Sequence, residues 1–595
     1  MRMKMKGMSA LGLLVCGAAL TISAIAQMDA GVPHLQKQGT ATQLIVDGKP
    51  FLALAGELTN NAATSLPMME PIWPKLVEGN LNTALVGVCW SQFEPEEGQF
   101  NYTQIDGVIA KARENHFHLV IIWFASWKNG TSSFAPYWVK KDYTRFPRIQ
   151  INDGKTVSIS GPVELLSTFG DATRDADAAA FKALMAHIKQ VDGTQHTVMM
   201  IQVENEVGVL RDSRDRSPAA NRAFAGQVPA ELMNYLEAHK NHLMPDLRAA
   251  WVANGEKKSG TWEGVFGPGK PADVEIPVET KSPPMSTYEH EGSWKELHWA
   301  SDEFFMAWNY ARYVGKVAEA GKSGYDIPMY VNGWEQQPNE AWPGTFPSGG
   351  PLPEVHDIWR AGAPAIDILS PDLYLPYFDV ICERWIQNGD PLFIPESGTV
   401  AGNVIMAVGK YNAIGYSPFG VDGGRPIPPD FAATYGMLNN LAPLILAHQG
   451  TGTMTAMRMV QGDSPKQVRL GNYTLTFTYT GRARGLPPQP KGGAVASPPR
   501  DPEPGAESLP PLEASAIAIA TGPDEYYFAG GGMRVDFTAN TPGPANVGLG
   551  VVQTGKFVDG KWELTRWIEG DDDAQGEILV LHPGIIERVQ LYRMP

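Results

Sequence analysis

Between residue 43 and about residue 450, short apolar runs rich in β-branched residues alternate with stretches of helical period. This alternation is typical of parallel strands joined by helical crossovers, and it limits the choice of fold more than any other feature. Several runs are apolar throughout, as in residues 119–123, which is typical of strands covered on both faces. We count eight candidate strands, at 52–56, 83–90, 118–124, 197–203, 329–334, 366–374, 391–395 and 413–419.

Eight strand–helix units predict an α/β fold of the TIM barrel, or (β/α)8, type, with its chemistry on loops at the carboxyl ends of the strands. Helices are expected at 105–114, 178–188, 231–239, 303–320 and 431–447. A long Pro/Gly-rich insertion at about 245–300 would lie over this face of the barrel.

Beyond residue 450 the apolar pattern changes to a period of two, as in residues 473–480. Residues 556–562 are typical of a hairpin with an Asp559-Gly560 turn. We therefore expect a barrel domain at 27–450 and a smaller all-β, sandwich-like domain at 451–595, with a Pro/Gly-rich insertion at 481–511.

The first 26 residues have the pattern of a signal peptide. Basic residues come first, an apolar run follows at 11–25, and Ala24-Ile25-Ala26 is a small-x-small cleavage pattern. The alternative, an uncleaved membrane anchor, is disfavoured because the run is short for a membrane span. We expect a secreted or periplasmic protein with no membrane insertion after cleavage.

Composition excludes several classes of protein. Of the 595 residues, 43% are hydrophobic and 19% are charged, which excludes a disordered or coiled-coil chain. The net charge of −16 repels phosphate backbones, so nucleic acid is not an expected partner. After cleavage only Cys89 and Cys382 remain, too few for a disulfide framework.

Carboxylates stand at the ends of two candidate strands. The fourth strand runs into Gln202-Val203-Glu204-Asn205-Glu206, and strand alternation predicts that Glu204 and Glu206 face one side, with Asn205 opposite until the strand gives way to loop. The seventh strand ends in Ile394-Pro395-Glu396. Two carboxylates across one barrel mouth are what retaining glycoside hydrolysis needs, one as proton donor and one as nucleophile. The alternative is that each glutamate forms a salt bridge at the barrel rim.

These residues resemble a known family. Residues 202–208, Gln-Val-Glu-Asn-Glu-x-Gly, are similar to the acid/base motif of glycoside hydrolase family 35, the β-galactosidases, in a clan of (β/α)8 retaining glycosidases that also contains family 42. The resemblance extends over most of residues 43–420. It implies that Glu206 is the general acid/base, that Asn205 binds the sugar 2-hydroxyl and that Glu396 is the nucleophile.

Three further loops fall where that family contacts sugar. They contain Trp90 within 90–100, Glu57 after the first strand, and Ser126 with Trp127 after the third. The sequence departs from the family at Phe93, Ser126 and Val207, where histidine, glutamate and tyrosine are usual. Loss of a hydroxyl-binding carboxylate at Ser126 weakens the inference to galactose more than the inference to hydrolysis. We therefore expect a divergent subgroup with the additional β domain.

Aromatic residues at strand ends suit a sugar pocket, because pyranose C–H faces stack on rings. The candidates are Trp90, Trp123, Trp127, Trp334 and Tyr374, and Tyr374 is placed to donate a hydrogen bond to Glu396. The alternative for each ring is filling of the barrel core.

The sequence thus predicts a secreted exo-glycosidase that acts on terminal β-galactosyl residues of a carbohydrate substrate by double displacement. No cofactor or metal is expected. The alternatives are another retaining activity of the same clan, such as a β-glucosidase, β-mannosidase or endo-glycanase, and a non-catalytic carbohydrate-binding protein. Oligomeric state is not indicated.

Overall fold

The structure is a computed structural model that describes residues 31–151, 165–271, 273–277, 296–337, 340–481, 513–558, 560–570 and 577–595. The expected signal peptide, Asp559 of the predicted turn and nearly all of the predicted 481–511 insertion lie outside these residues.

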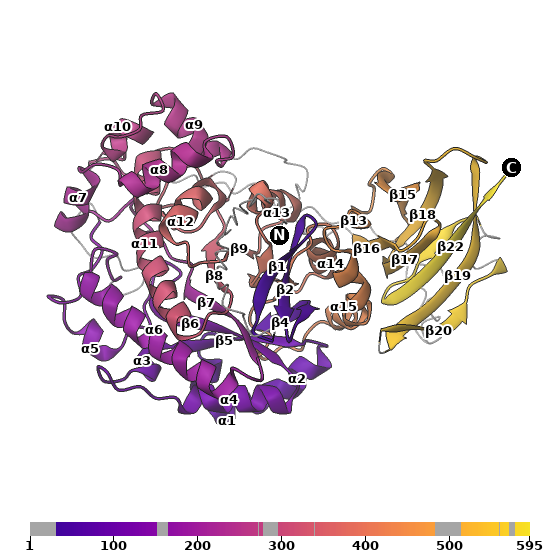
Figure 1. Ribbon diagram of the computed structural model, residues 1–595, viewed down its shortest axis with the longest axis horizontal. Coiled ribbons are helices and arrows are strands. Elements are labelled where there is room, and N and C mark those ends of the chain that lie inside the picture. The colour runs from indigo at the N-terminus through magenta and orange to yellow at the C-terminus, as the bar shows by residue number, and fades with distance from the viewer. Residues whose placement is uncertain are drawn as a thin grey trace, which may run out of the picture.

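The first large unit is a parallel barrel surrounded by helices (Figure 1). Its sheet has the order β10-β12-β4-β5-β6-β7-β8-β9-β11. The strands are β4 (Ala53–Glu57), β5 (Thr83–Cys89), β6 (His118–Lys128), β7 (Val198–Asn205), β8 (Met329–Trp334), β9 (Ile368–Leu373), β10 (Phe393–Ile394), β11 (Glu396–Ser397) and β12 (Gly415–Tyr416). The predicted TIM barrel is confirmed.

The seventh barrel strand is divided into β10 and β11 at Pro395. Proline has no backbone N–H to give to a neighbouring strand, which accounts for the division. β10 pairs with β12 and β11 pairs with β9, so the two pieces together close the ring. Each of the eight predicted strands coincides with an observed barrel strand.

The amino-terminal end of the barrel is covered by a small antiparallel sheet. It consists of β1 (His34–Gln38), β2 (Ala41–Val46) and β3 (Lys49–Phe51). Leu44 and Val46 pack with barrel-interior residues such as Ala55, Val120 and Ile122. Because this end is closed, the chemistry belongs at the opposite, carboxyl end of the strands.

Helices form the outer layer of the barrel. α6 shows why they form: its buried Phe181, Leu184, Met185 and Ile188 recur at helical spacing and leave a polar outer face. The larger helices are α2 (Ile72–Glu78), α4 (Thr103–Glu114), α6 (Asp171–Asp192), α8 (Ala230–His239), α9 (Pro245–Ala253), α11 (Ala300–Gly324), α13 (Phe378–Trp385), α14 (Ala401–Gly409) and α15 (Pro429–His448). Shorter ones are α1 (Leu66–Met69), α3 (Trp90–Phe93), α5 (Tyr137–Lys140), α7 (Pro218–Phe224), α10 (Trp262–Phe266) and α12 (His356–Gly362).

The second unit contains two antiparallel sheets, as the two-residue period predicts. One has the order β13-β16-β17-β22-β19-β20 and the other β14-β15-β18-β21. Alternate residues of β15, Tyr473, Leu475 and Phe477, enter the core that the two sheets share. The strands are β13 (Met454–Val460), β14 (Lys466–Leu470), β15 (Tyr473–Tyr479), β16 (Glu513–Ala520), β17 (Glu525–Gly531), β18 (Met533–Ala539), β19 (Asn546–Val558), β20 (Lys561–Trp567), β21 (Leu579–Leu581) and β22 (Ile585–Met594).

The six-stranded sheet packs against the barrel through α14 and α15, which lie between the two units in Figure 1. Ile517, Ile519, Tyr527 and Ile586 of that sheet belong to the same apolar cluster as the barrel helices. Among the described residues, no helix is long and apolar enough to cross a bilayer.

Candidate active site

Glu206 and Glu396 meet at the carboxyl end of the barrel. Glu206 directly follows β7, and Glu396 begins β11. Carboxylate oxygens of Glu206, Glu396 and a third acid, Asp372, lie within 4.8 Å of one another. The three side chains are nearly buried, with residue exposures of 6%, 7% and 2%. Ionised carboxylates that lie this close together and this deeply buried raise the free energy of the folded state, unless they are protonated, paired with a cation or needed for the chemistry.

The end of β7 departs from regular strand geometry. Glu204 and Glu206 both have left-handed backbone conformations, with φ of 63° and 43°. Such residues are uncommon outside glycine, and they rotate the side chains out of strand alternation. The prediction that Glu204 and Glu206 share a side with Asn205 opposite is therefore wrong. Asn205 instead donates from Nδ2 to Glu206 Oε2 at 3.2 Å.

The side chain of Glu204 binds the neighbouring strand β6 rather than the carboxylate cluster. Its two oxygens accept the backbone N–H groups of Ser126 and Trp127 at 3.1 and 2.9 Å. Burial and the neighbouring Asp177 carboxyl raise the pKa of Glu204 well above its usual value. Glu204 thus joins β7 to the carboxyl end of β6.

Glu396 is oriented by Tyr374, whose hydroxyl donates to Glu396 Oε1 at 2.7 Å. This is the bond that the sequence suggested. Glu396 Oε2 has no hydrogen-bond partner among the described residues, and none of the described Lys or Arg side chains forms an ion pair with Glu396. A rim salt bridge therefore does not account for this residue.

The electrostatics distinguish Glu206 as a proton donor. Burial, followed by the charge of Glu396, raises the pKa of Glu206 to about 7. Lys128 opposes this rise, and its Nζ lies 3.9 Å from Glu206 Oε2. A carboxyl with this pKa is protonated below neutral pH, as a general acid must be.

The remaining predicted sugar-binding residues divide into two groups. Glu57, Trp334 and Tyr374 end β4, β8 and β9 or follow them directly, at the same end of the barrel as Glu206. Trp334 and Tyr374 are 40% and 52% exposed and form an aromatic rim. Glu57 is 1% exposed, and burial and the charge of Glu396 raise its pKa well above the usual value.

Trp90, Trp127 and Ser126 are fully buried and their polar side-chain groups have partners within the protein, so the prediction that they contact sugar does not fit the structure. The indole of Trp90 donates to Glu94, and that of Trp127 donates to the Leu166 carbonyl. Ser126 Oγ donates to Asp177 and lies 2.8 Å from the Tyr313 hydroxyl. The alternative of core filling applies to these three side chains.

Sequence reasoning missed Asp372 and Lys128 as members of the site. Asp372 lies near the end of the apolar run of β9, the same signal that identified Glu396. Lys128 is the last residue of β6. Both could have been found by applying the strand-end rule to every strand.

Oxygen ligands at this spacing could also hold a divalent cation. Neighbouring buried carboxyls also avoid mutual repulsion when one of them holds a proton, and burial raises the pKa of both Glu206 and Asp372. We therefore interpret the cluster as one that holds a proton.

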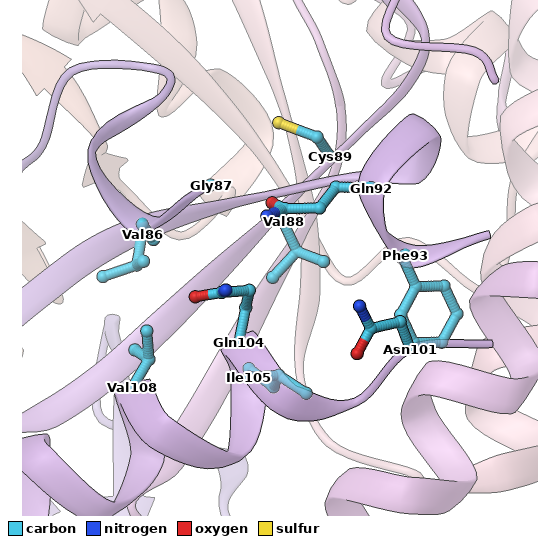
Figure 2. A pocket seen from close by; sticks show the side chains of 11 residues that line it. Val86, Gly87, Val88, Cys89, Gln92, Phe93, Asn101, Gln104, Ile105 and Val108 are labelled. Atoms are coloured by element: carbon cyan, nitrogen blue, oxygen red, sulfur yellow. The ribbon is translucent and has the colours of Figure 1, made fainter. Parts of the chain in front are cut away.

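A separate small cavity lies between β5 and α4 (Figure 2). Its volume is about 20 Å³, and its lining includes Val86, Cys89, Asn101, Gln104 and Val108. Ligand pockets are usually of several hundred Å³, so this space holds about one water molecule and no sugar. Burial raises the pKa of the Cys89 thiol to about 12, which makes it unreactive.

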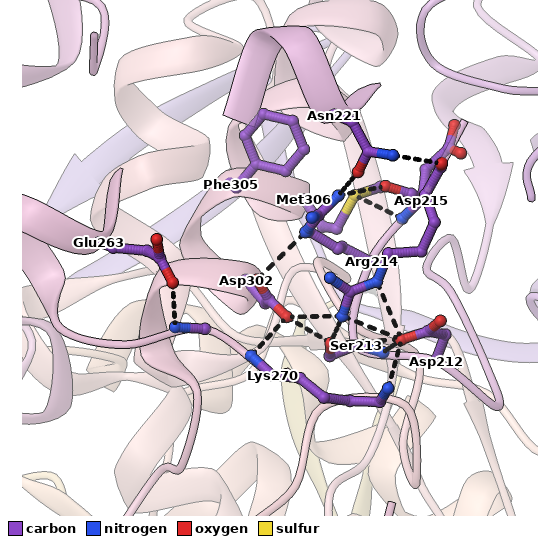
Figure 3. Close-up of polar contacts among 12 residues, drawn as sticks. Asp212, Ser213, Arg214, Asp215, Asn221, Glu263, Lys270, Asp302, Phe305 and Met306 are labelled. Carbon is purple, nitrogen blue, oxygen red and sulfur yellow. Dashed lines mark hydrogen bonds and ion pairs between the residues drawn. The ribbon is translucent and has the colours of Figure 1, made fainter. Parts of the chain in front are cut away.

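The loop after β7 is held by a buried network of charges (Figure 3). Asp302, in the first turn of α11, pairs with Arg214 at 3.3 Å and with Arg216 at 3.1 Å. It also accepts hydrogen bonds from Ser213 Oγ and the Lys270 backbone N–H. The network ties the segment that begins at Glu206 to an outer helix.

Replacing Asp302 with alanine should lower the free energy of unfolding by about 3–5 kcal/mol, because two buried guanidinium groups lose a partner. Chemical denaturation measures this loss. Asp175→Ala is the matched control, since Asp175 pairs with Arg174 at the surface with 68% of its side chain exposed. Its loss should be below about 1 kcal/mol. Equal losses in the two variants would contradict the assigned role of the network.

Comparison with known families adds to this geometry. Residues 70–282 match the family model described as "Beta-galactosidase", glycoside hydrolase family 42. Part of the barrel therefore matches a glycoside hydrolase family. The matched part includes Glu206 and ends before Glu396. The β-galactosidase-like resemblance is confirmed at this level, although the matching model is that of family 42 rather than family 35.

Residues 431–579 match a domain of unknown function, DUF5597. No curated protein matches the sequence.

Similar solved structures include β-galactosidases from Rahnella sp. R3 (15% identity, TM-score 0.40) and from Halorubrum lacusprofundi (13%, 0.41). Each alignment covers 66% of this chain, and it covers 56% and 58% of the two β-galactosidases, so the chain spans little more than half of their length. The catalytic domain of a β-amylase from Paenibacillus polymyxa aligns at 12% identity and a TM-score of 0.39, over 62% of this chain and 92% of that one.

Proposed function

We propose that this chain is a retaining glycosidase that removes terminal β-galactosyl residues from an oligo- or polysaccharide. The observation that carries the proposal is the placement of Glu206 and Glu396 at one barrel mouth with carboxylate oxygens within 4.8 Å. Retaining enzymes hold their two carboxyl groups about 5–5.5 Å apart, whereas inverting enzymes leave room for a water molecule between them.

In the first step, Glu396 attacks the anomeric carbon while the glycosidic C–O bond breaks. The bonding electron pair goes to the leaving oxygen, which takes the proton of Glu206. In the second step, Glu206, now a carboxylate, removes a proton from water. The water oxygen displaces Glu396, and the second inversion restores the β configuration.

The two glutamates have environments that suit these roles. Glu206, with a pKa of about 7, holds a proton at mildly acidic pH. Glu396 receives the Tyr374 hydroxyl on one oxygen and keeps the other without a partner among the described residues, as a nucleophile needs. A non-catalytic carbohydrate-binding protein would not need two glutamates that differ in this way in protonation and hydrogen bonding.

The galactosyl specificity is part of the proposal. It is supported by the description of the matching family and by the resemblance of residues 202–208 to family 35. Within the site, Glu57, Lys128 and Asn205 are placed to bind hydroxyls, and Trp334 to stack on a ring. A β-glucosidase, a β-mannosidase or an endo-glycanase is the alternative. The leader-like segment at 1–26 supports a secreted or periplasmic location.

A panel of nitrophenyl β-glycosides tests both parts of the proposal. We expect the β-galactoside to be cleaved fastest, and we expect NMR to show the β-anomer of galactose as the first product. First release of the α-anomer would contradict double displacement. Faster cleavage of another glycoside would reassign the sugar, and binding without turnover would support the non-catalytic alternative.

A further inference from the structure

Asp372 lies beside the two proposed catalytic glutamates. One of its oxygens lies within 4.8 Å of a carboxylate oxygen of each glutamate. Oδ2 accepts a hydrogen bond from Asn332 Nδ2 at 2.6 Å. Oδ1 accepts no hydrogen bond from the described residues, although it is fully buried. A buried carboxyl oxygen with no donor, next to two other carboxyls, is where a proton is expected.

Asn332 connects Asp372 to the backbone of Glu206. While Nδ2 donates to Asp372, Oδ1 accepts the Glu206 backbone N–H at 3.0 Å. This N–H belongs to the residue whose φ is 43°, a conformation that needs support from its surroundings. Asp372 therefore fixes the amide orientation of Asn332, and Asn332 fixes the main chain of Glu206.

Asp372 is also placed by the nucleophile strand. In the parallel pairing of β11 with β9, Glu396 is the register partner of Asp372. Since β11 contains only two residues, this pairing is a large part of what holds Glu396 in the sheet. The backbone pairing of β9 with β11 thus sets where Asp372 lies relative to Glu396.

We propose that Asp372 is the positioning residue of the acid/base: its protonated carboxyl donates a hydrogen bond to Glu206 and accepts one from Asn332. The proposal deepens the function proposed above and rests on it. In the first step the proton that leaves is that of Glu206. The Asp372 proton stays on Asp372, and its hydrogen bond stabilises the Glu206 carboxylate that forms.

The charges around Asp372 favour this protonation. Burial raises the pKa of Asp372 well above its usual value, and the charges of Glu396, Glu206 and Glu57 raise it further, against Lys128. The phenols of Tyr330 and Tyr374 face the same group and remain neutral, since burial raises the pKa of both.

Two substitutions separate hydrogen bonding from charge. Asparagine at 372 can donate one hydrogen bond and accept another, as a protonated aspartic acid does, and alanine can do neither. The proposed hydrogen bond from Asp372 would lower the pKa of Glu206, so its loss should raise that pKa. In D372A we expect the alkaline limb of kcat/KM to move up by about one pH unit and kcat to fall about 100-fold, with KM changed much less.

In D372N we expect the alkaline limb to stay near that of the wild type and kcat to fall less than about tenfold. Infrared spectra at neutral pH should show a protonated-carboxyl band in the wild type that is weaker in D372N. D192N is the control: Asp192 is also buried, but it pairs with Arg113 and accepts the Val198 N–H at the opposite end of the barrel. Its pH profile should be that of the wild type.

An unmoved alkaline limb in a folded D372A would overturn the proposal, as would D372N as impaired as D372A. Glu206→Gln and Glu396→Gln, assayed in parallel, distinguish failure of the proposed role of Asp372 from failure of the proposed function. If both lose activity while the Asp372 variants behave as the wild type, the proposed function stands and the role of Asp372 fails. If both remain fully active, the proposed function itself is wrong.

Discussion

Replacing Glu396 with glutamine is expected to lower kcat/KM for a nitrophenyl β-galactoside by about 10⁵-fold, because an amide cannot form the glycosyl–enzyme bond. The fold should persist, since the amide oxygen of glutamine can still accept the Tyr374 hydroxyl that now binds Glu396 at 2.7 Å. Steady-state kinetics measure the loss, and thermal unfolding verifies that the variant is folded.

Glu587→Gln provides the control for this substitution. Glu587 is 2% exposed and accepts from His582 in the β domain, so the change is equally buried but remote from the barrel mouth. Its activity should equal that of the wild type. Azide added to Glu396→Gly should restore turnover and give the α-galactosyl azide, the product of a single displacement. A folded Glu396→Gln enzyme of full activity would refute the nucleophile assignment.

Replacing Glu206 with glutamine has the second-largest expected effect, about 10³-fold in kcat for substrates with poor leaving groups. For activated aryl leaving groups, which need no proton, the first step should be nearly unaffected and the second should limit turnover. The pH dependence gives an independent measurement. With a pKa of about 7, Glu206 holds its proton below neutral pH and loses it above.

Wild-type kcat/KM should therefore fall about tenfold per unit as pH rises beyond about 7. In Glu206→Gln this alkaline limb should vanish, since glutamine does not titrate. A limb that persists unchanged in the variant would assign the titration to another group and would contradict the acid/base role.

The barrel could be predicted because its strands are nearly continuous apolar segments, a pattern that parallel strands covered on both faces require. Residues 329–334 coincide with β8, whereas the predicted 413–419 strand shortens to Gly415–Tyr416. The start of α6 was missed because the residues that it buries there, Thr173 and Asp177, are polar and do not continue the apolar period. The pattern of apolar residues thus predicted which segments form strands and helices, but it did not predict the residues at which they begin and end.

For the site, the strand-end rule located Glu206 and Glu396 but could not reveal the left-handed backbone at Glu204 and Glu206. That conformation depends on partners distant in sequence, Ser126, Trp127 and Asn332, which no local pattern specifies. Burial of Trp90 and Trp127 was equally hidden, since tryptophan serves both cores and sugar platforms.

The contact of the six-stranded sheet with α14 and α15 bears on how this protein can be divided. α14 begins four residues after β11 ends, and apolar side chains of the sheet cover it from outside. A polypeptide truncated near residue 450 would expose apolar side chains of α14, a helix close in sequence to the proposed nucleophile Glu396, to water. We therefore expect the barrel domain to be insoluble when it is expressed alone, which would prevent any assay of its activity.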